Sequence, residues 1–282
     1  MSEIFGAALM GGGSGPAFAA ISVTYPAGAT CICSLDGKTL TAPDTSGTAL
    51  FIVPYAGEWI VTAVQGNDTA TAILNIIEPK AYVVVLDFLV PFDYQRIEYI
   101  QSDGNQYIKT GYQLENASKV AKTSFAFDAA FINATNQAAV YNIMGSGNYF
   151  MGWDKSSANK IVFAVGTGDT KTYSFTRDNG RHVWAADPST GIIKFDDEIL
   201  YSGNFNGSLG GYPELWLCIG SLNITTPSRL YGAEIKYDGE IVHQYYPCYR
   251  KNDNVVGVWD FVEKEFLTNA GSGLFIAGGD IQ

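Results

Sequence analysis

The sequence predicts an all-β protein built from two β-sandwiches, a small one followed by a large jelly roll. Short runs rich in Val, Ile, Thr and aromatic residues alternate with Gly, Pro, Asp and Asn along the chain, a pattern typical of strands joined by turns. No run has a convincing helical period of apolar side chains. At roughly 100–200 residues per domain, a chain of 282 residues has room for two such units.

Composition and charge exclude several classes of protein. Apolar residues make up 47% and charged residues 16% of the chain, so it can bury a core and is not disordered in bulk. The net charge of −11 argues against nucleic acid as a partner, because phosphate binding needs a basic patch. It also argues against docking on an anionic membrane surface, and no apolar run approaches the roughly 18 residues of a membrane span.

Residues 1–18 predict a flexible, Gly-rich arm rather than a secretory signal. A signal would start with basic residues and continue with an uninterrupted apolar stretch. Here Glu3 is the only early charge, and the glycines at 11–13 interrupt the apolar residues. A Gly-rich segment of this kind is flexible, and the alternative is an attachment segment that becomes ordered only on a partner.

Residues 19–89 predict the small sandwich, with short strands at the spacing typical of such folds. The expected strands lie at 20–26, 30–35, 49–55, 58–64, 70–77 and 82–88. The stretches 44–47, 51–54 and 56–62 resemble the carboxypeptidase-regulatory-like and Ig-like modules of phage structural proteins. That resemblance implies a hairpin with Trp59 in the core.

Residues 90–93 form the expected linker, and residues 94–282 the large jelly roll. Fourteen of 17 Tyr and four of five Trp lie beyond residue 92, and a large sandwich needs many aromatic side chains to fill its interior. About fourteen short strands are expected in this region. Asp238-Gly239, between two alternating runs, is the strongest hairpin signal.

The second region also resembles a known family. Its opening, RIEYIQSDGNQYIKTGY at 96–112, and its close, VVGVWDFVEKEFLTNAGSGLFIAG at 255–278, are the most specific segments. Residues 181–200, 215–221 and 229–250 add weaker similarity. Together they resemble the laminin G-like, concanavalin A-like domain of tail and baseplate proteins of phages and prophages of gut bacteria.

The resemblance implies a non-enzymatic virion protein that recognises a surface. It would assemble in the bacterial cytoplasm with other virion proteins. Its partner would be a cell-surface or mucin glycan. Individual sugar sites are weak, so we expect a homo-oligomer whose repeated sites raise avidity. One alternative is a purely structural virion component without a ligand; the other is a glycoside hydrolase on a concanavalin A-like fold.

Aromatic side chains near polar loop residues mark the candidate glycan site, because sugar rings stack on aromatic faces and are bracketed by polar groups. Tyr149, Met151 and Trp153 would share one face of a strand. The same residues could instead fill the core, since alternation does not say which face is exposed to water. The candidate ligand-binding residues are Tyr149, Trp153, Asp154, Tyr212 and Tyr246.

The catalytic motifs of glycoside hydrolases, serine hydrolases and nucleotide-binding enzymes are missing from the sequence. Glycoside hydrolases need two facing carboxylates, and the E-x-D-x-x-E or E-x-D-x-E strand motif is absent. Asp196-Asp197 is expected in a hairpin turn. There is no G-x-S-x-G elbow and no dinucleotide or Walker motif. His182 and His243 are expected as packed or rim residues of strands. No catalytic residue and no organic cofactor are predicted.

Calcium is the one cofactor that the sequence leaves open. Lectin-like folds hold it with Asp and Asn oxygens at loop tips, and the candidates here are Asp154, Asp169, Asp178 and Asn223.

The four cysteines are expected as buried, reduced thiols. Cys31 and Cys33 are two residues apart on one strand, a poor geometry for a disulfide. Cys218 and Cys248 could pair, which their spacing does not decide. No C-x-x-C zinc spacing occurs.

Overall fold

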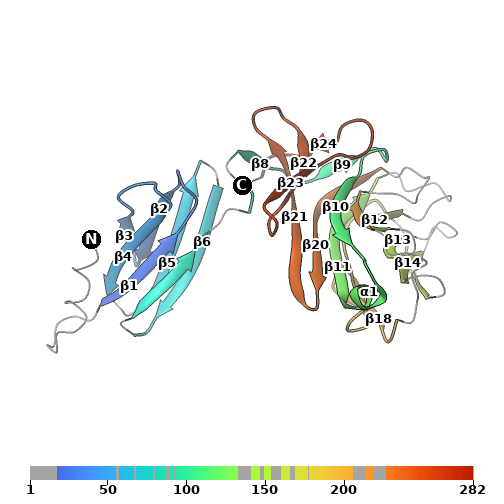
Figure 1. Cartoon of the computed structure of the whole chain (residues 1–282), viewed down its shortest axis with the longest axis horizontal. Coiled ribbons are helices and arrows are strands. Elements are labelled where there is room, and N and C mark those ends of the chain that lie inside the picture. The colour runs from blue at the N-terminus through green and yellow to red at the C-terminus, as the bar shows by residue number, and fades with distance from the viewer. Residues whose placement is uncertain are drawn as a thin grey trace. The chain divides into compact units, whose positions relative to one another are not determined.

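The structure, a computed structural model, shows an all-β protein that divides into two compact units (Figure 1). It describes residues 18–54, 57–66, 68–78, 80–86, 89–91, 93–132, 141–146, 149–153, 160–165, 169–176, 178–205, 214–218 and 227–281. The first unit ends at residue 92 and the second covers residues 93–281. The change from one unit to the other therefore falls inside the expected linker, and the all-β prediction is confirmed. Residues 1–17 of the arm expected at 1–18 lie outside the described residues, and Phe18 is the first residue of β1 rather than part of the arm.

The first unit is a small sandwich of two sheets. One sheet has the order β4-β1-β7, with β1 antiparallel to β4 and parallel to β7. The other has the order β3-β2-β5-β6. The strands are β1 (Phe18–Thr24), β2 (Thr30–Leu35), β3 (Lys38–Thr41), β4 (Thr48–Pro54), β5 (Gly57–Gln65), β6 (Asp68–Ile76) and β7 (Ala81–Val85).

The core of the first unit follows from alternation along these strands. Ile21 of β1, Val53 of β4 and Val61 of β5 are fully buried, while the residue that precedes each of them along its strand is more exposed. Trp59 is 3% exposed and belongs to the same core, which confirms its predicted place. Cys33 lies in this core too.

The second unit is a larger sandwich whose two sheets enclose one aromatic core. The smaller sheet has six strands in the order β10-β19-β12-β13-β14-β15. The larger sheet contains eleven strands, and its main path is β18-β17-β16-β11-β20-β21-β22-β23, with β8, β9 and β24 paired at its side. The strands are β8 (Tyr94–Arg96), β9 (Ile100–Ser102), β10 (Ile108–Gln113), β11 (Thr123–Phe131), β12 (Tyr141–Ser146), β13 (Tyr149–Trp153), β14 (Lys160–Val165), β15 (Thr170–Ser174), β16 (Arg181–Asp187), β17 (Ile192–Phe195), β18 (Glu198–Ser202), β19 (Glu214–Leu217), β20 (Ser228–Tyr237), β21 (Glu240–Arg250), β22 (Val256–Asp260), β23 (Glu265–Thr268) and β24 (Ile276–Ala277).

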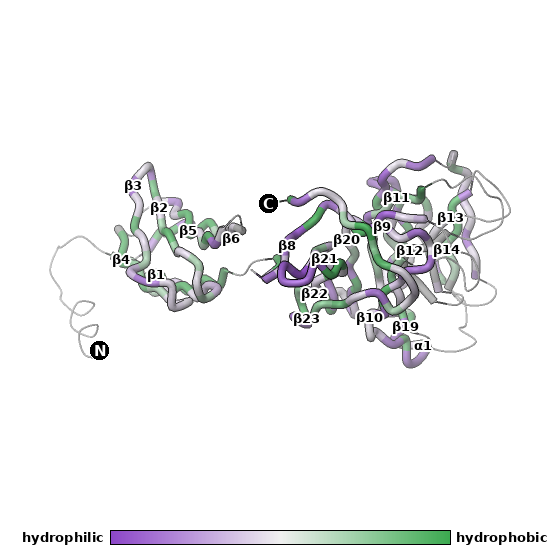
Figure 2. Tube along the Cα trace, turned by 90° about the horizontal axis from the view of Figure 1, so that it is seen from above, coloured by the Kyte–Doolittle hydropathy of each residue, from purple (hydrophilic) through white to green (hydrophobic). Residues whose placement is uncertain are grey.

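Two-residue periodicity decides which side chains the second unit buries. Phe125 and Phe127 of β11 are buried, whereas the alternate residues Ser124, Ala126 and Asp128 are partly exposed. Successive side chains of a strand point to opposite faces, so the first set meets the smaller sheet and the second set faces outward. The trace coloured by hydropathy shows this mixture of apolar and polar residues along the strands of both units (Figure 2).

The predicted hairpins are confirmed where the turn residues are most specific. Asp238 and Gly239 join β20 to β21 with φ angles of 53° and 88°. Positive φ at both positions is the requirement of a type I′ turn, which Asp-Gly satisfies with little strain. Asp196 opens the turn between β17 and β18 with a φ of 52°, so Asp196-Asp197 is a turn pair as expected.

One short helix was not expected from the sequence. α1 (Ala117–Lys122) begins at Asn116, whose side chain accepts a hydrogen bond from the backbone N–H of Lys119 at 2.9 Å. Such a cap stabilises the first turn. With six residues and one buried side chain, Val120, α1 is too short to show a helical period.

All four cysteines are buried and unpaired, so Cys218 and Cys248 do not form the disulfide that the sequence left open. Burial raises the pKa of the Cys33 thiol to about 11 and that of Cys248 to about 12. Both are therefore protonated near neutral pH and are poor nucleophiles. Among the described residues, no helix has the length and apolar character needed to cross a membrane.

Candidate binding groove

A shallow groove of about 290 Å³ lies on the outward face of the larger sheet. It crosses four neighbouring strands in the order β17-β16-β11-β20. Neighbouring strands are about 4.8 Å apart, so the two wall strands, β17 and β20, are separated by roughly 14 Å. The groove is thus wide enough for one extended ligand chain and is floored by two strands.

Small side chains make the floor low. Ala126 of β11 is paired with Ala185 of β16 on one side and with Glu234 of β20 on the other. Ala185 is in turn paired with Lys194 of β17. One row across the sheet therefore reads Lys194, Ala185, Ala126, Glu234, with long side chains at both ends and methyl groups between them.

The charged groups of the groove are mostly engaged with each other or with hydroxyl groups. Lys236 pairs with Glu234 at 2.7 Å. The Asp187 carboxylate accepts hydrogen bonds from the hydroxyl groups of Ser189 at 2.6 Å and Thr190 at 2.8 Å. Burial alone would raise the pKa of Asp187, but these hydrogen bonds outweigh it and hold the pKa below its usual value. The groove therefore presents ionised, hydrogen-bonding walls.

An arginine–tyrosine cluster lies on the same face of β11, β16 and β20. Arg181 donates two hydrogen bonds to Asp128, at 2.8 and 2.6 Å, and its guanidinium lies 4.1 Å from the ring centre of Tyr231. Tyr231 packs edge-on against Tyr99 at 5.4 Å. Since Asp128 is two residues along β11 from Ala126, this cluster is about 7 Å along the strand from the groove floor.

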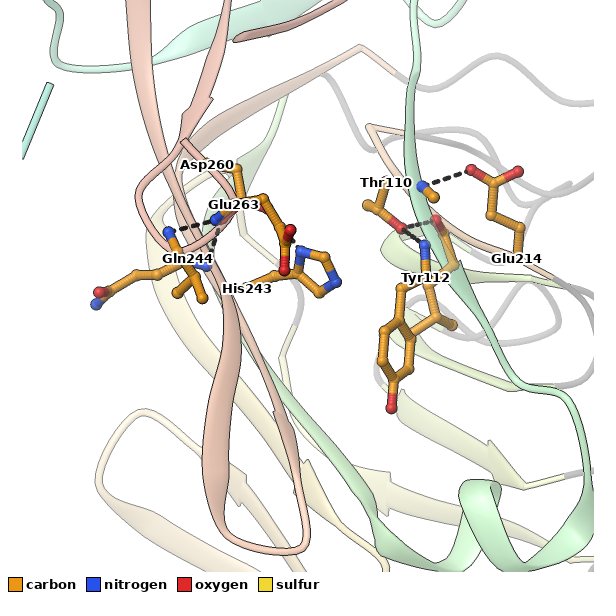
Figure 3. A network of polar contacts seen from close by, with 10 residues as sticks. Thr110, Tyr112, Glu214, His243, Gln244, Asp260 and Glu263 are labelled. Carbon is orange, nitrogen blue, oxygen red and sulfur yellow. Dashed lines mark hydrogen bonds and ion pairs between the residues drawn. The ribbon is translucent and has the colours of Figure 1, made fainter. Parts of the chain in front are cut away.

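A second polar network occupies the edge of the sandwich interior (Figure 3). His243 Nδ1 lies 2.6 Å from Asp260, and Asp260 also accepts the backbone N–H of Val262 at 3.0 Å. The His243 ring stacks on Tyr245 and meets Tyr112 of β10 edge-on. Figure 3 shows His243 facing Tyr112 and Thr110 across the gap between the sheets.

This network lacks the nucleophile of a catalytic triad. The Thr110 hydroxyl donates to the carbonyl of Leu215 and accepts from the backbone N–H of Tyr112 at 3.2 Å, so it is already engaged. His243 is a packed strand residue, as expected, and Asp260 organises the turn that follows β22.

His182 lies between the carboxylates of Asp178 and Asp196, and these three side chains are called the His182 clamp below. Its Nε2 lies 2.8 Å from Asp178 and its Nδ1 2.9 Å from Asp196, while its ring packs on Phe195 at 4.5 Å. Burial works to lower the pKa of His182, but the two carboxylates outweigh it and raise the pKa above the ordinary 6.5. The same contact with His182 lowers the pKa of Asp178.

This clamp predicts a pH-dependent stability of the second unit. A raised pKa in the folded state means that the clamp stabilises the fold fully below about pH 6.5 and loses this contribution as pH rises through the folded pKa. Because both carboxylates are about half exposed, the loss should be about 0.5–1 kcal/mol. Denaturant unfolding at pH 5.5 and pH 8 measures it. His182→Gln should remove this difference; an unchanged difference in that variant would contradict the assignment to His182.

The structure corrects two of the predicted glycan residues. Tyr149 and Trp153 do share one face of β13 with Met151, but that face points into the core, where Tyr149 is 0% and Trp153 1% exposed. The Tyr149 hydroxyl donates a hydrogen bond to the backbone carbonyl of Thr123 at 2.6 Å. Neither side chain can stack on a sugar. The reason is that β13 is an interior strand of the smaller sheet, so its aromatic face is needed against the larger sheet.

The other predicted ligand residues have different outcomes. Tyr246 is half-buried on β21 and lies beneath Arg96, whose guanidinium is 5.4 Å from the ring centre. It does not line the groove. Asp154 and Tyr212 lie outside the described residues.

Two of the four calcium candidates have other partners. Asp169 is buried and pairs with Lys171 at 2.6 Å, and Asp178 binds His182. Asp154 and Asn223 lie outside the described residues. Within the described part of the chain, no group of three or more His, Cys, Asp or Glu side chains is placed to hold a metal ion.

The residues of the groove were not among the candidates from sequence. They are mainly Ala, Ser, Lys and Glu at alternate strand positions, which are ordinary residues for a solvated sheet face. Only the pairing of four strands from distant parts of the chain brings them together.

No protein-family model matches the chain, and no curated protein sequence matches it. Among solved structures, a DUF3823 family protein from Bacteroides ovatus is similar over 68% of this chain and 98% of its own, with 10% identity and a TM-score of 0.19. A protein from Bacteroides uniformis described as a candidate carbohydrate-binding protein is similar over 73% of this chain and 98% of its own, with 12% identity and a TM-score of 0.21. Similarities this low assign neither a family nor a function.

Proposed function

We propose that the protein is a non-enzymatic carbohydrate-binding protein whose ligand lies in the groove of the larger sheet. The observation that carries this proposal is the groove itself: a floor of Ala126, Ala185 and Ser124 between walls that carry Lys194, Glu234 and Lys236. A flat floor of small groups admits a sugar ring, and charged walls offer donors and acceptors to its hydroxyl groups.

The chemistry of the walls favours binding over hydrolysis. A glycoside hydrolase needs one carboxyl group that stays protonated to act as general acid. In the groove, Asp187 has a lowered pKa and Glu234 is held in an ion pair with Lys236. The lowered pKa of Asp187 opposes the protonated form that a general acid needs, and the Glu234 carboxylate is engaged by Lys236, so we expect no release of reducing sugar from any glycan that binds.

The proposed biological setting is a phage or prophage virion, and it rests on the sequence resemblance. The glycan would belong to a bacterial surface or to mucin. Repeated copies in an oligomer would raise the avidity of a shallow site. Mass spectrometry of purified particles, and light scattering of the purified protein, test these two parts of the proposal separately.

Filling the groove should abolish binding without unfolding the protein. We expect the full chain, displayed multivalently on an array of bacterial polysaccharides and mucin glycans, to give hits that free glycan competes away. Ala185→Trp should weaken the strongest hit at least tenfold, because an indole would occupy the space above Ala126. Thr172→Trp adds the same bulk to an exposed position of β15, on the other sheet, and should bind as the wild type does.

Two results would contradict this proposal. No glycan bound by the well-folded protein, with and without calcium, would favour the structural-component alternative. Undiminished binding by Ala185→Trp would place the site elsewhere in the protein.

A further inference from the structure

The electrostatics of the groove is asymmetric. The oxygens of Asp187 accept hydrogen bonds from the hydroxyl groups of Ser189 and Thr190, and Glu234 forms an ion pair with Lys236. Lys194, on the opposite wall from Glu234, is exposed and makes no ion pair with any residue in the described part of the chain. The four formal charges of the groove sum to zero, and Lys194 is the one of these four side chains without a hydrogen-bonded or ion-paired partner in the described part of the chain.

The other lysine of the groove can contribute further donors. An ammonium group has three N–H donors, and Lys236 uses one on Glu234. Its remaining donors are available to a ligand that lies between the walls. A carboxylate placed near Lys194 would thus have a charged partner on β17, while the rest of the ligand meets the Glu234–Lys236 pair on β20.

From this arrangement we propose that the groove selects a carboxylated sugar, such as a uronic or sialic acid, through Lys194. This inference rests on the proposed function and names its ligand class. The net charge of −11 repels densely charged polyanions at long range. The expected ligand is therefore an oligosaccharide with a single acidic sugar among neutral ones, rather than a polymer with a charge on every residue.

Matched pairs of sugars test the selectivity directly. We would titrate the full chain calorimetrically with sialyllactose against its carboxyl-reduced form, and with a glucuronic acid-containing trisaccharide against its carboxyl-reduced form. Each pair differs in the carboxylate, and the two pairs distinguish the two acidic sugars. A charge-assisted hydrogen bond is strong, so at least one acidic sugar should bind about tenfold more tightly than its neutral counterpart.

Variants of Lys194 connect the selectivity to the groove. Lys194→Gln should remove most of the tenfold preference, whereas Lys194→Arg should retain it because the charge remains. Lys160→Gln removes an equal charge from an exposed position of β14, on the other sheet, and should leave the preference unchanged. All three should melt at the wild-type temperature, since Lys194 makes no ion pair within the described structure.

The outcomes separate this inference from the proposed function. Neutral glycans that bind as well as acidic ones would overturn the inference and leave the proposed function intact. A preference that survives in Lys194→Gln would also overturn it. Absence of binding to every sugar tested and to the whole array would overturn both.

Discussion

Trp184→Ala should destabilise the second unit by about 3–5 kcal/mol, the range for removing a large aromatic side chain from a core. Trp184 is 0% exposed and lies at the centre of the aromatic core. Its ring is 4.6 Å from that of Phe195 and 5.1 Å from that of Trp153, both in edge-on contact, and 5.8 Å from that of Phe127. These partners come from both sheets, so the cavity would open between them and could not close by a local shift.

Scanning calorimetry of the full chain measures this effect. At roughly 2–4 °C per kcal/mol for a domain of this size, the melting temperature of the second unit should fall by roughly 6–20 °C. Val183→Ala is the matched control, because Val183 is the preceding residue of β16, is 44% exposed and points to the outward face. A Trp184→Ala protein that melts within 2 °C of the wild type would show that the core is not packed as described.

The same variant links the core to the groove. Trp184 is the neighbour of Ala185 on β16, and the two side chains point to opposite faces of the strand. Packing of Trp184 therefore holds the strand that supplies the groove floor. If the proposed function holds, Trp184→Ala should weaken glycan binding through loss of folded protein, and binding should recover at low temperature.

Asp260→Ala is expected to have the second large effect. It should lower the free energy of unfolding of the second unit by about 3 kcal/mol or more. The carboxylate is 2% exposed and paired with His243. It also accepts the backbone N–H groups of Gln244 and Val262 at 3.3 and 3.0 Å. Alanine would leave these part-buried backbone donors and the His243 ring without their hydrogen-bond partner, and each such loss typically costs about 1–3 kcal/mol.

Glu265→Ala provides the control for Asp260→Ala. Glu265 faces Asp260 across the β22–β23 pair and is exposed, so its removal should change the stability by less than about 0.5 kcal/mol. Chemical denaturation followed by circular dichroism compares the two variants. A loss below about 1 kcal/mol in Asp260→Ala would mean that water or another group replaces the carboxylate.

Much of the fold could be predicted from the sequence, because turn residues and the alternation of apolar and polar residues along a strand are local signals. Asp238-Gly239 predicted its hairpin, since few other residue pairs accept positive φ at both positions. The strand expected at 30–35 has the bounds of β2 in the structure. The strand β3 of the first unit was missed because it has four residues and all of them are exposed.

The residues of the candidate site could not be predicted from the sequence in the same way. Alternation placed Tyr149 and Trp153 on one face of a strand, which is correct, but it could not say whether that face met water or another sheet. The structure shows the second sheet, and both residues are core residues. Conversely, Ala126 and Ala185 carry no signal in sequence and become a groove floor only because β11 and β16 pair with each other.

The sequence by itself therefore determined the all-β class, the change of unit near residues 90–93 and the main hairpins, because each depends on residues close together in the chain. Only the tertiary structure decided which face of each strand is buried, which cysteines stay apart and where a ligand could lie. Those properties depend on pairings such as β11 with β20, which join residues about 100 positions apart, and no local pattern encodes them.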